Sequence, residues 1–130
     1  MAYEIAGQMI TVPWGSTAAA TTADQYTFMV IDSNGRAINP NTTSFVRPIG
    51  VLQNRPSAQG AAATIMINGV TKIRAAASTI GVGDSVAATT AGSIVAGGST
   101  GFPRVGFILA GSSSTSVTYK TLLLAPGPSV

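Results

Sequence analysis

The stretch PIGVLQNRPSAQGAAATIMINGVTKIRA, residues 48–75, holds two runs of β-branched and aliphatic residues separated by a loop of small and polar residues. Apolar runs that are bounded by turn residues in this way are typical of strands. A shorter version of the arrangement returns as RVGFILAGSSSTSVTYKTLLL, residues 104–124. When Gly50 is laid on Gly106, IGVLQ aligns with VGFIL, and each run leads through a small-residue loop into a second apolar run. We therefore expect a strand–loop–strand unit that occurs twice.

The aligned glycines Gly50 and Gly106 also predict close packing at these two positions. A glycine inside a strand lets another backbone or a large side chain approach closely. Two such units would pair into one small closed or half-closed barrel, which removes exposed strand edges.

Strand and turn signals alternate through the rest of the chain, and helical periodicity is nearly absent. The run YTFMVID, residues 26–32, is followed by Asn34-Gly35, a strong signal for a tight turn. Asn68-Gly69 predicts either a hairpin turn or a bulge within one bent strand, and STIGVGDSV, residues 78–86, predicts a compact turn. The predicted fold class is all-β, with a single small β-barrel or sandwich-like domain over residues 25–130. Residues 1–24 are predicted to form an N-terminal arm, or a first strand plus a loop.

The composition is unusually poor in charge. Charged residues make up 8% of the 130 residues, compared with about 25% in an ordinary soluble domain, while Ala, Thr, Ser and Gly supply 64 positions. Charge normally keeps a free monomer apart from its neighbours, so we expect neighbouring molecules to cover much of this surface.

Neither a nucleic acid nor a membrane is an expected partner. No two of the seven cations are adjacent, whereas a nucleic-acid binder usually concentrates such charge on one face. No apolar run approaches the ~20 residues of a membrane span. The first ten residues lack the basic start of a signal peptide, so we expect synthesis in a cytoplasm.

The residues that usually carry catalysis are scarce. The absence of His and Cys removes the commonest general base and the thiolate metal sites, and only Lys72 and Lys120 could act as a base for one of the thirteen serines. The four carboxylates are Glu4, Asp24, Asp32 and Asp84. They are widely separated along the chain, whereas glycosidases and hard-cation sites need carboxylates that face one another. Asp32 and Asp84 lie beside turn residues, where we expect them to bind backbone N–H groups. We predict no enzyme, no catalytic residue, no cofactor and no metal site.

The cluster QMITVPWG, residues 8–15, is apolar but precedes the first convincing strand. One interpretation is a first strand that covers the core. The other is an arm that packs on a partner through Met9, Ile10 and Trp14, because exposed Met and Trp are typical interface anchors. The second interpretation makes these three residues the candidate protein-interface residues.

Residues 45–125 resemble the small capsid cement or decoration proteins of tailed bacteriophages. That family shows a strand with a central glycine, a small-residue loop, a strand ending in Gly-Val-x-Lys-hydrophobic, a Gly-Asp-x-Val turn and a closing strand pair. The positions of this chain that match the pattern are Gly69, Val70, Lys72, Gly83, Asp84, Val86 and Gly106.

The resemblance implies a β-rich virion protein on the outside of the capsid, often a homotrimer, that binds the major capsid protein and reinforces the shell. Two other classes fit the composition. One is a tail or head-fibre module of the virion, and the other is a secreted β-rich adhesin or carbohydrate-binding module. The adhesin or carbohydrate-binding class is less favoured because this chain has few aromatic residues that could stack on a sugar, namely Tyr3, Trp14, Tyr26 and Tyr119.

Overall fold

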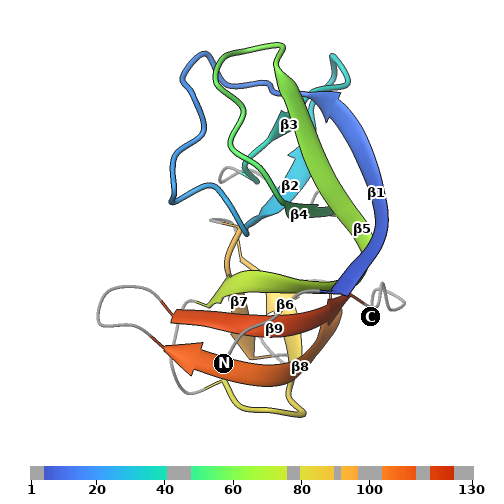
Figure 1. The fold of residues 1–130 in the computed structure, drawn as a ribbon, viewed down its shortest axis with the longest axis vertical. Coiled ribbons are helices and arrows are strands. Elements are labelled where there is room, and N and C mark those ends of the chain that lie inside the picture. The colour runs from blue at the N-terminus through green and yellow to red at the C-terminus, as the bar shows by residue number, and fades with distance from the viewer. Residues whose placement is uncertain are drawn as a thin grey trace.

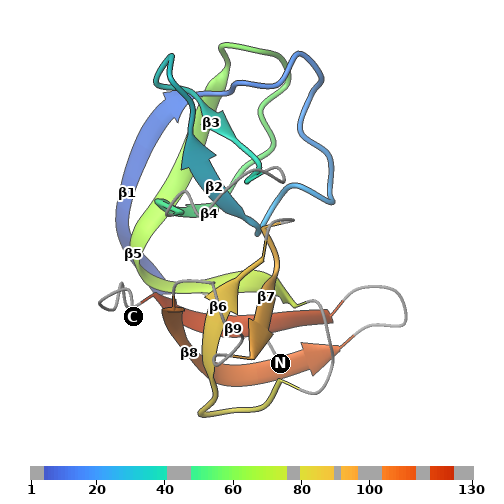
Figure 2. The ribbon, with the colours of Figure 1, turned by 180° about the vertical axis from the view of Figure 1, so that it is seen from behind.

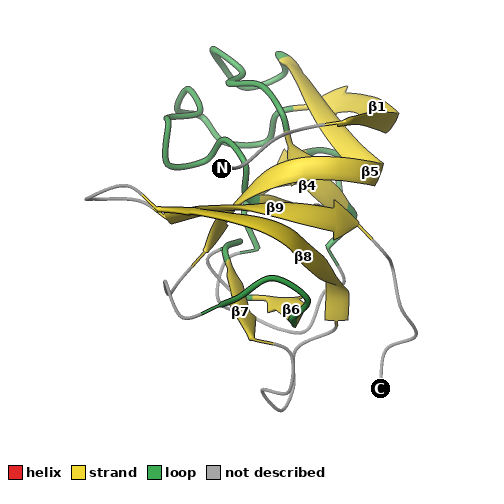
Figure 3. Ribbon diagram, turned by 60° about the horizontal axis from the view of Figure 1, so that its bottom comes forward, coloured by secondary structure: helices red, strands yellow, loops and turns green. Residues whose placement is uncertain are grey.

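A computed structural model describes residues 5–40, 48–75, 80–89, 92–96, 104–113 and 118–124. These residues form strands and loops only (Figure 3), which confirms the predicted all-β class. The described part of the chain therefore offers no helix that is long and apolar enough to cross a membrane. The strands are β1 (Ile5–Pro13), β2 (Phe28–Ile31), β3 (Ala37–Ile38), β4 (Gly50–Leu52), β5 (Ala62–Ala75), β6 (Ser85–Ala88), β7 (Ile94–Ala96), β8 (Arg104–Ser113) and β9 (Thr118–Leu124).

The long strand β5 organises the sheet. The strand order is β3-β2-β4-β5-β7-β6-β8-β9, and β1 pairs with β5 outside this path. The first part of β5 pairs with β1 and β4, and its last part pairs with β9 and β7. In Figure 1 the first part lies in an upper half with β1 to β4, and the last part lies in a lower half with β6 to β9. Figure 2 shows β6 and β7 of the lower half from behind.

A bend at Asn68-Gly69 lets β5 serve both halves. The structure has one continuous strand here rather than a hairpin turn, which decides between the two alternatives that the sequence left open. Gly69 has a φ of 124°, a backbone conformation that residues with a Cβ rarely adopt. Strand β1 crosses close to the bend, since a Cβ added to Gly7 would collide with the carbonyl of Asn68. The two glycines therefore make the crossing and the bend possible.

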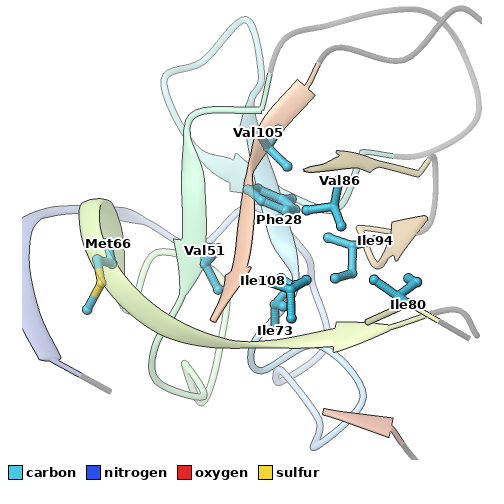
Figure 4. Close-up of a cluster of buried hydrophobic side chains, with 9 residues drawn as sticks. All are labelled: Phe28, Val51, Met66, Ile73, Ile80, Val86, Ile94, Val105 and Ile108. Carbon is cyan, nitrogen blue, oxygen red and sulfur yellow. The ribbon is translucent and has the colours of Figure 1, made fainter. Parts of the chain in front are cut away.

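The layer formed by β2, β4 and the first part of β5 is buried on both faces. Phe28 and Val51 face one hydrophobic cluster, while their neighbours Met29 and Leu52 face another. This division follows from the two-residue period of a strand. The lower cluster (Figure 4) consists of Phe28, Val51, Met66, Ile73, Ile80, Val86, Ile94, Val105 and Ile108. The upper cluster consists of Trp14, Ala20, Met29, Ala37, Leu52, Ala63 and Ile65.

Both segments that align in the sequence form antiparallel strand pairs, β4 with β5 and β8 with β9. Their burial differs, however. Val51 is fully buried, whereas the aligned Phe107 is 47% exposed. Residues 114–117 of the second loop lie outside the described residues.

Candidate interaction surfaces

The carboxylates of the two predicted turns bind backbone N–H groups, as expected. Asp32 Oδ1 accepts hydrogen bonds from the N–H groups of Asn34 (2.8 Å) and Arg36 (2.9 Å). Asp84 Oδ2 accepts one from the N–H of Gly81 (2.8 Å). Both turns hold a glycine with a positive φ, Gly35 (76°) and Gly83 (87°). These acids stabilise local structure.

The turn at Asp32 also affects the charge of this group. The backbone N–H of Arg36 has the largest effect and lowers the pKa of Asp32. Desolvation has the next largest effect and opposes it, while the N–H of Asn34 and the Arg36 guanidinium, 3.1 Å away, lower the pKa further. Hydrogen bonds to an ionised carboxylate favour its charged form. The turn therefore favours the ionised form of the Asp32 carboxylate.

Asp24 ties the loop before β2 to the end of β3. Its two carboxylate oxygens accept hydrogen bonds from the Thr21 N–H (2.7 Å), the Thr21 hydroxyl (3.0 Å) and the Asn39 amide (2.7 Å). A hollow of about 430 Å³ lies beside this network, lined by Trp14, Ser16, Ala18, Ala19, Thr21, Asp24, Ile38 and Asn39. Because the Asp24 carboxylate already accepts three hydrogen bonds, we infer that it stabilises the loop before β2.

No metal centre forms among the described residues, since they contain no group of three His, Cys, Asp or Glu side chains that could hold an ion. Glu4 lies outside the described residues. Within the described part of the chain, every buried side-chain nitrogen or oxygen has a hydrogen-bond partner.

Tyr26 links the two halves of the molecule. Its N–H donates to the carbonyl of Leu52 (2.9 Å) in β4, and its carbonyl accepts from the N–H of Arg74 (2.9 Å) near the end of β5. Its φ of 63° is uncommon for a bulky residue, and the Lys72 Nζ lies 5.5 Å from its ring centroid. The unusual backbone is explained by these two hydrogen bonds to different strands.

The three candidate interface residues occupy different environments. Residues 5–13 form a strand paired with β5, which is one of the two alternatives that the sequence left open. Trp14 is 2% exposed in the upper cluster and donates from Nε1 to the carbonyl of Ala18 (2.8 Å). Ile10 packs half-buried against the same cluster, and Met9 is 41% exposed. An interface at these residues stays a prediction, and in this conformation Met9 is the member that a partner can reach.

A second apolar surface, which the sequence did not single out, lies on the outer face of β8. We call it the β8 patch, and it consists of Val82, Phe107 and Leu109, which are 68%, 47% and 37% exposed. Phe107 and Leu109 flank Ile108, which points into the lower cluster. The N–H of Gly83 donates to the Ile108 carbonyl (2.8 Å) and the Ile108 N–H to the Asp84 carbonyl (3.0 Å). These bonds hold the loop that carries Val82 beside β8.

The two-residue period of a strand explains why Phe107 and Leu109 are exposed on either side of the buried Ile108. Ile108 lies opposite Leu122 and Ala110 opposite Thr121, so Leu109 is also the extra residue of a β-bulge. Within the run VGFIL no polar residue marks which positions face outward, so the sequence alone could not identify the patch.

The comparisons with known proteins add no relative. No protein-family model matches this sequence, and no curated protein matches it significantly. The β8 patch and the strand β1 are therefore candidate interaction surfaces on the evidence of the structure alone.

Proposed function

We propose that this protein is a structural component of a tailed-phage virion that binds the outside of the assembled capsid and cements it. The observation that carries the proposal is the β8 patch, three large exposed apolar side chains on β8 and on the loop hydrogen-bonded to it, in a chain with 8% charged residues. Clustered exposed apolar side chains mark protein-interaction sites. Because residues 45–125 resemble capsid cement proteins, we propose the major capsid protein as the partner that binds this patch.

Cementing needs no catalysis, only binding that favours the assembled state. A ligand that binds the assembled shell better than its separated subunits stabilises the shell by its binding free energy. Many copies on one particle multiply a modest contact. In this proposal the protein is not an enzyme, needs no cofactor, and works at the exterior of the capsid after synthesis in the host cytoplasm.

The finer architecture that we propose is a small barrel built around the lower cluster. The pairings lead from β5 through β9, β8 and β6 to β7, and β7 returns to β5 through the parallel pair Ala75↔Ile94. The strand–loop–strand unit that begins at Gly50 and again at Gly106 is proposed to be a repeat. The resemblance alone implies a trimer, and we propose this state for the copies bound to the capsid, not for the free chain.

Particles purified from a phage lysate that contains the chain test the proposal directly. Mass spectrometry should find many copies per particle, and antibody labelling in the electron microscope should place them on the capsid. Absence from the particles, or a label confined to the tail, would refute a cement function.

A pair of charge variants then tests the surface. Phe107→Asp places a charge on the β8 patch, whereas Ser57→Asp adds the same charge to an exposed position in the β4–β5 loop of the upper half. Cosedimentation with capsids should be lost for Phe107→Asp and kept for Ser57→Asp. Equal binding by the two variants would remove the β8 patch from the interface.

A further inference from the structure

Among the described residues, the strand β1 has one edge without a partner strand. Within the described residues it pairs with β5, and its other edge is unpaired up to Pro13, after which Trp14 forms a bridge with Ala37 of β3 and the N–H of Gly15 donates to the Ala37 carbonyl (2.8 Å). In Figures 1 and 2 β1 runs along the flank of the upper half. Long edge strands are usually protected by charged side chains or other devices against pairing with another chain. Residues 5–14 contain no Asp, Glu, Lys or Arg.

The hydrogen bonds of β5 show which backbone groups of β1 are available at this edge. Thr64 uses its N–H and its carbonyl on the β4 side, where they bind the side chain of Asn54 (2.9 Å) and the N–H of Gln53 (2.8 Å). Thr11 lies opposite Thr64, so the two form a pair that exchanges no hydrogen bonds. The N–H and the carbonyl of Thr11 therefore point away from β5.

The same alternation gives the direction of the backbone N–H and carbonyl groups of the residues near Thr11. Met9, two residues earlier and opposite Met66, also directs its N–H and carbonyl to the open edge. Pro13 takes the next outward position, where it has no N–H to offer. The N–H of Trp14 donates back to the carbonyl of Ala61 (2.8 Å), as the alternation requires. The open edge thus presents two complete donor–acceptor pairs, at Met9 and Thr11, and ends at Pro13, beyond which Ala37 of β3 lies beside Trp14 and Gly15.

We propose that this edge pairs with the same edge of a second copy of the chain. The two β1 strands run antiparallel about a twofold axis through Ile10, so that Met9 of each copy lies opposite Thr11 of the other. Each of these pairs exchanges both N–H···O=C bonds. Pro13 lies opposite Gly7 of the other copy, within the irregular part of β1 between Ile5 and Gln8, and takes no part in the pairing. The register that centres on Thr11 would place Pro13 opposite Met9 and lose a donor on each side.

A second copy is the occupant that the residues favour. An edge that meets itself about a twofold must tolerate each of its own side chains, and β1 has no charge that would repel its copy. Pairing also covers Met9, which is 41% exposed. The twofold contact uses β1 alone and leaves the β8 patch accessible, so this inference does not depend on the capsid.

Proline and serine at position 11 provide a matched pair of variants. Thr11→Pro removes the outward N–H without removing a hydrogen bond to β5, whereas Thr11→Ser keeps the N–H. Sedimentation velocity over a wide concentration range should show a monomer–dimer equilibrium for the unmodified chain and for Thr11→Ser. The dissociation constant of Thr11→Pro should rise by about tenfold or more, because one hydrogen bond is lost in each half of the dimer.

Met9→Lys keeps the backbone intact and serves if Thr11→Pro does not fold, which circular dichroism will show. It adds the charge that natural edge strands use against pairing and should also weaken the dimer. A chain that stays monomeric at all concentrations would overturn the proposal. Pairing of β1 with a different protein would not rescue it, because the proposed partner is a second copy of the chain. Variants that dimerise as tightly as the unmodified chain would overturn it too.

Single cysteines test the register, because the chain has no cysteine of its own. Directly opposed residues have Cβ atoms about 4.5–5.5 Å apart and diagonal ones about 7–8 Å, and a disulfide needs about 3.5–4.5 Å. Ile10→Cys should therefore form a crosslinked dimer under mild oxidation well before Met9→Cys does. Faster crosslinking of Met9→Cys would overturn the register.

Discussion

The substitution Trp14→Ala distinguishes most sharply between a core strand and a detachable arm. Trp14 is 2% exposed and packs in the upper cluster, and its indole N–H donates to the carbonyl of Ala18. Removing a buried Trp side chain typically costs about 3–5 kcal/mol. Domains of this size have a total free energy of unfolding of about 5–15 kcal/mol. We therefore expect Trp14→Ala to lose a large fraction of the stability and to be partly unfolded if the native chain is marginal.

Urea unfolding followed by far-UV circular dichroism measures this loss. Fluorescence is unsuitable for the variant because Trp14 is the only Trp of the chain. With a denaturant slope of about 2 kcal/mol per molar urea, the midpoint should fall by about 2 M. The control is Met9→Ala on the same strand, where the side chain is 41% exposed and the cost should stay below about 1 kcal/mol.

A Trp14→Ala chain within about 1 kcal/mol of the unmodified protein, with the same denaturant slope, would refute the core assignment. In that case the N-terminal segment would be an arm whose Trp14 is free to bind a partner. Deleting residues 1–14 extends the same test. The pairing of β1 with β5 leads us to expect a truncated chain that unfolds, whereas an arm could be removed without loss of the β domain.

Three further outcomes follow from local contacts. Gly50→Ala should destabilise the fold by about 1–3 kcal/mol in urea unfolding, because the added Cβ would collide with the carbonyl of Met66 and lie 2.8 Å from the Ile65 Cγ2. Asp24→Ala should cost about 1–2 kcal/mol in the same assay, since three donors lose their acceptor; an unchanged midpoint would show that the loop needs no such support. Asp32→Asn should lower the midpoint at neutral pH but not in acid. The pKa of Asp32 is lowered by folding, so its contribution is present above the unfolded pKa of about 4 and is lost as the pH falls through the lower folded pKa.

The strands and the turns could be predicted because each depends on residues close in the sequence. The Asn34-Gly35 turn and the turn at Gly83 follow from residues that tolerate a positive φ, and both form as expected. The role of the Asp32 carboxylate follows from the same local geometry. Such signals need no knowledge of the partner strands.

The environment of β1 could not be predicted, because it depends on contacts distant in the sequence. Trp14 is buried by residues from β2 to β5, such as Leu52 and Ile65, and no local pattern states that these residues will meet it. The β8 patch was missed for a related reason. A continuous apolar run such as VGFIL is compatible with either face pointing inward, and nothing in this run marks Ile108 as the residue that faces the core.

The shared strand β5 connects the two candidate surfaces. Ile65 contributes to the upper cluster, and its neighbour Met66 contributes to the lower one, together with Ile73 farther along the strand. Loss of β1 would expose the upper face and one edge of β5, and the lower cluster would then depend on a strand held only by β4 and the lower half. The β8 patch lies on the outer side of that lower cluster, since Ile108 between its two strand residues points inward. The N-terminal strand is thus linked to the β8 patch through β5, which pairs with β1 and contributes Met66 and Ile73 to the cluster in which Ile108 packs.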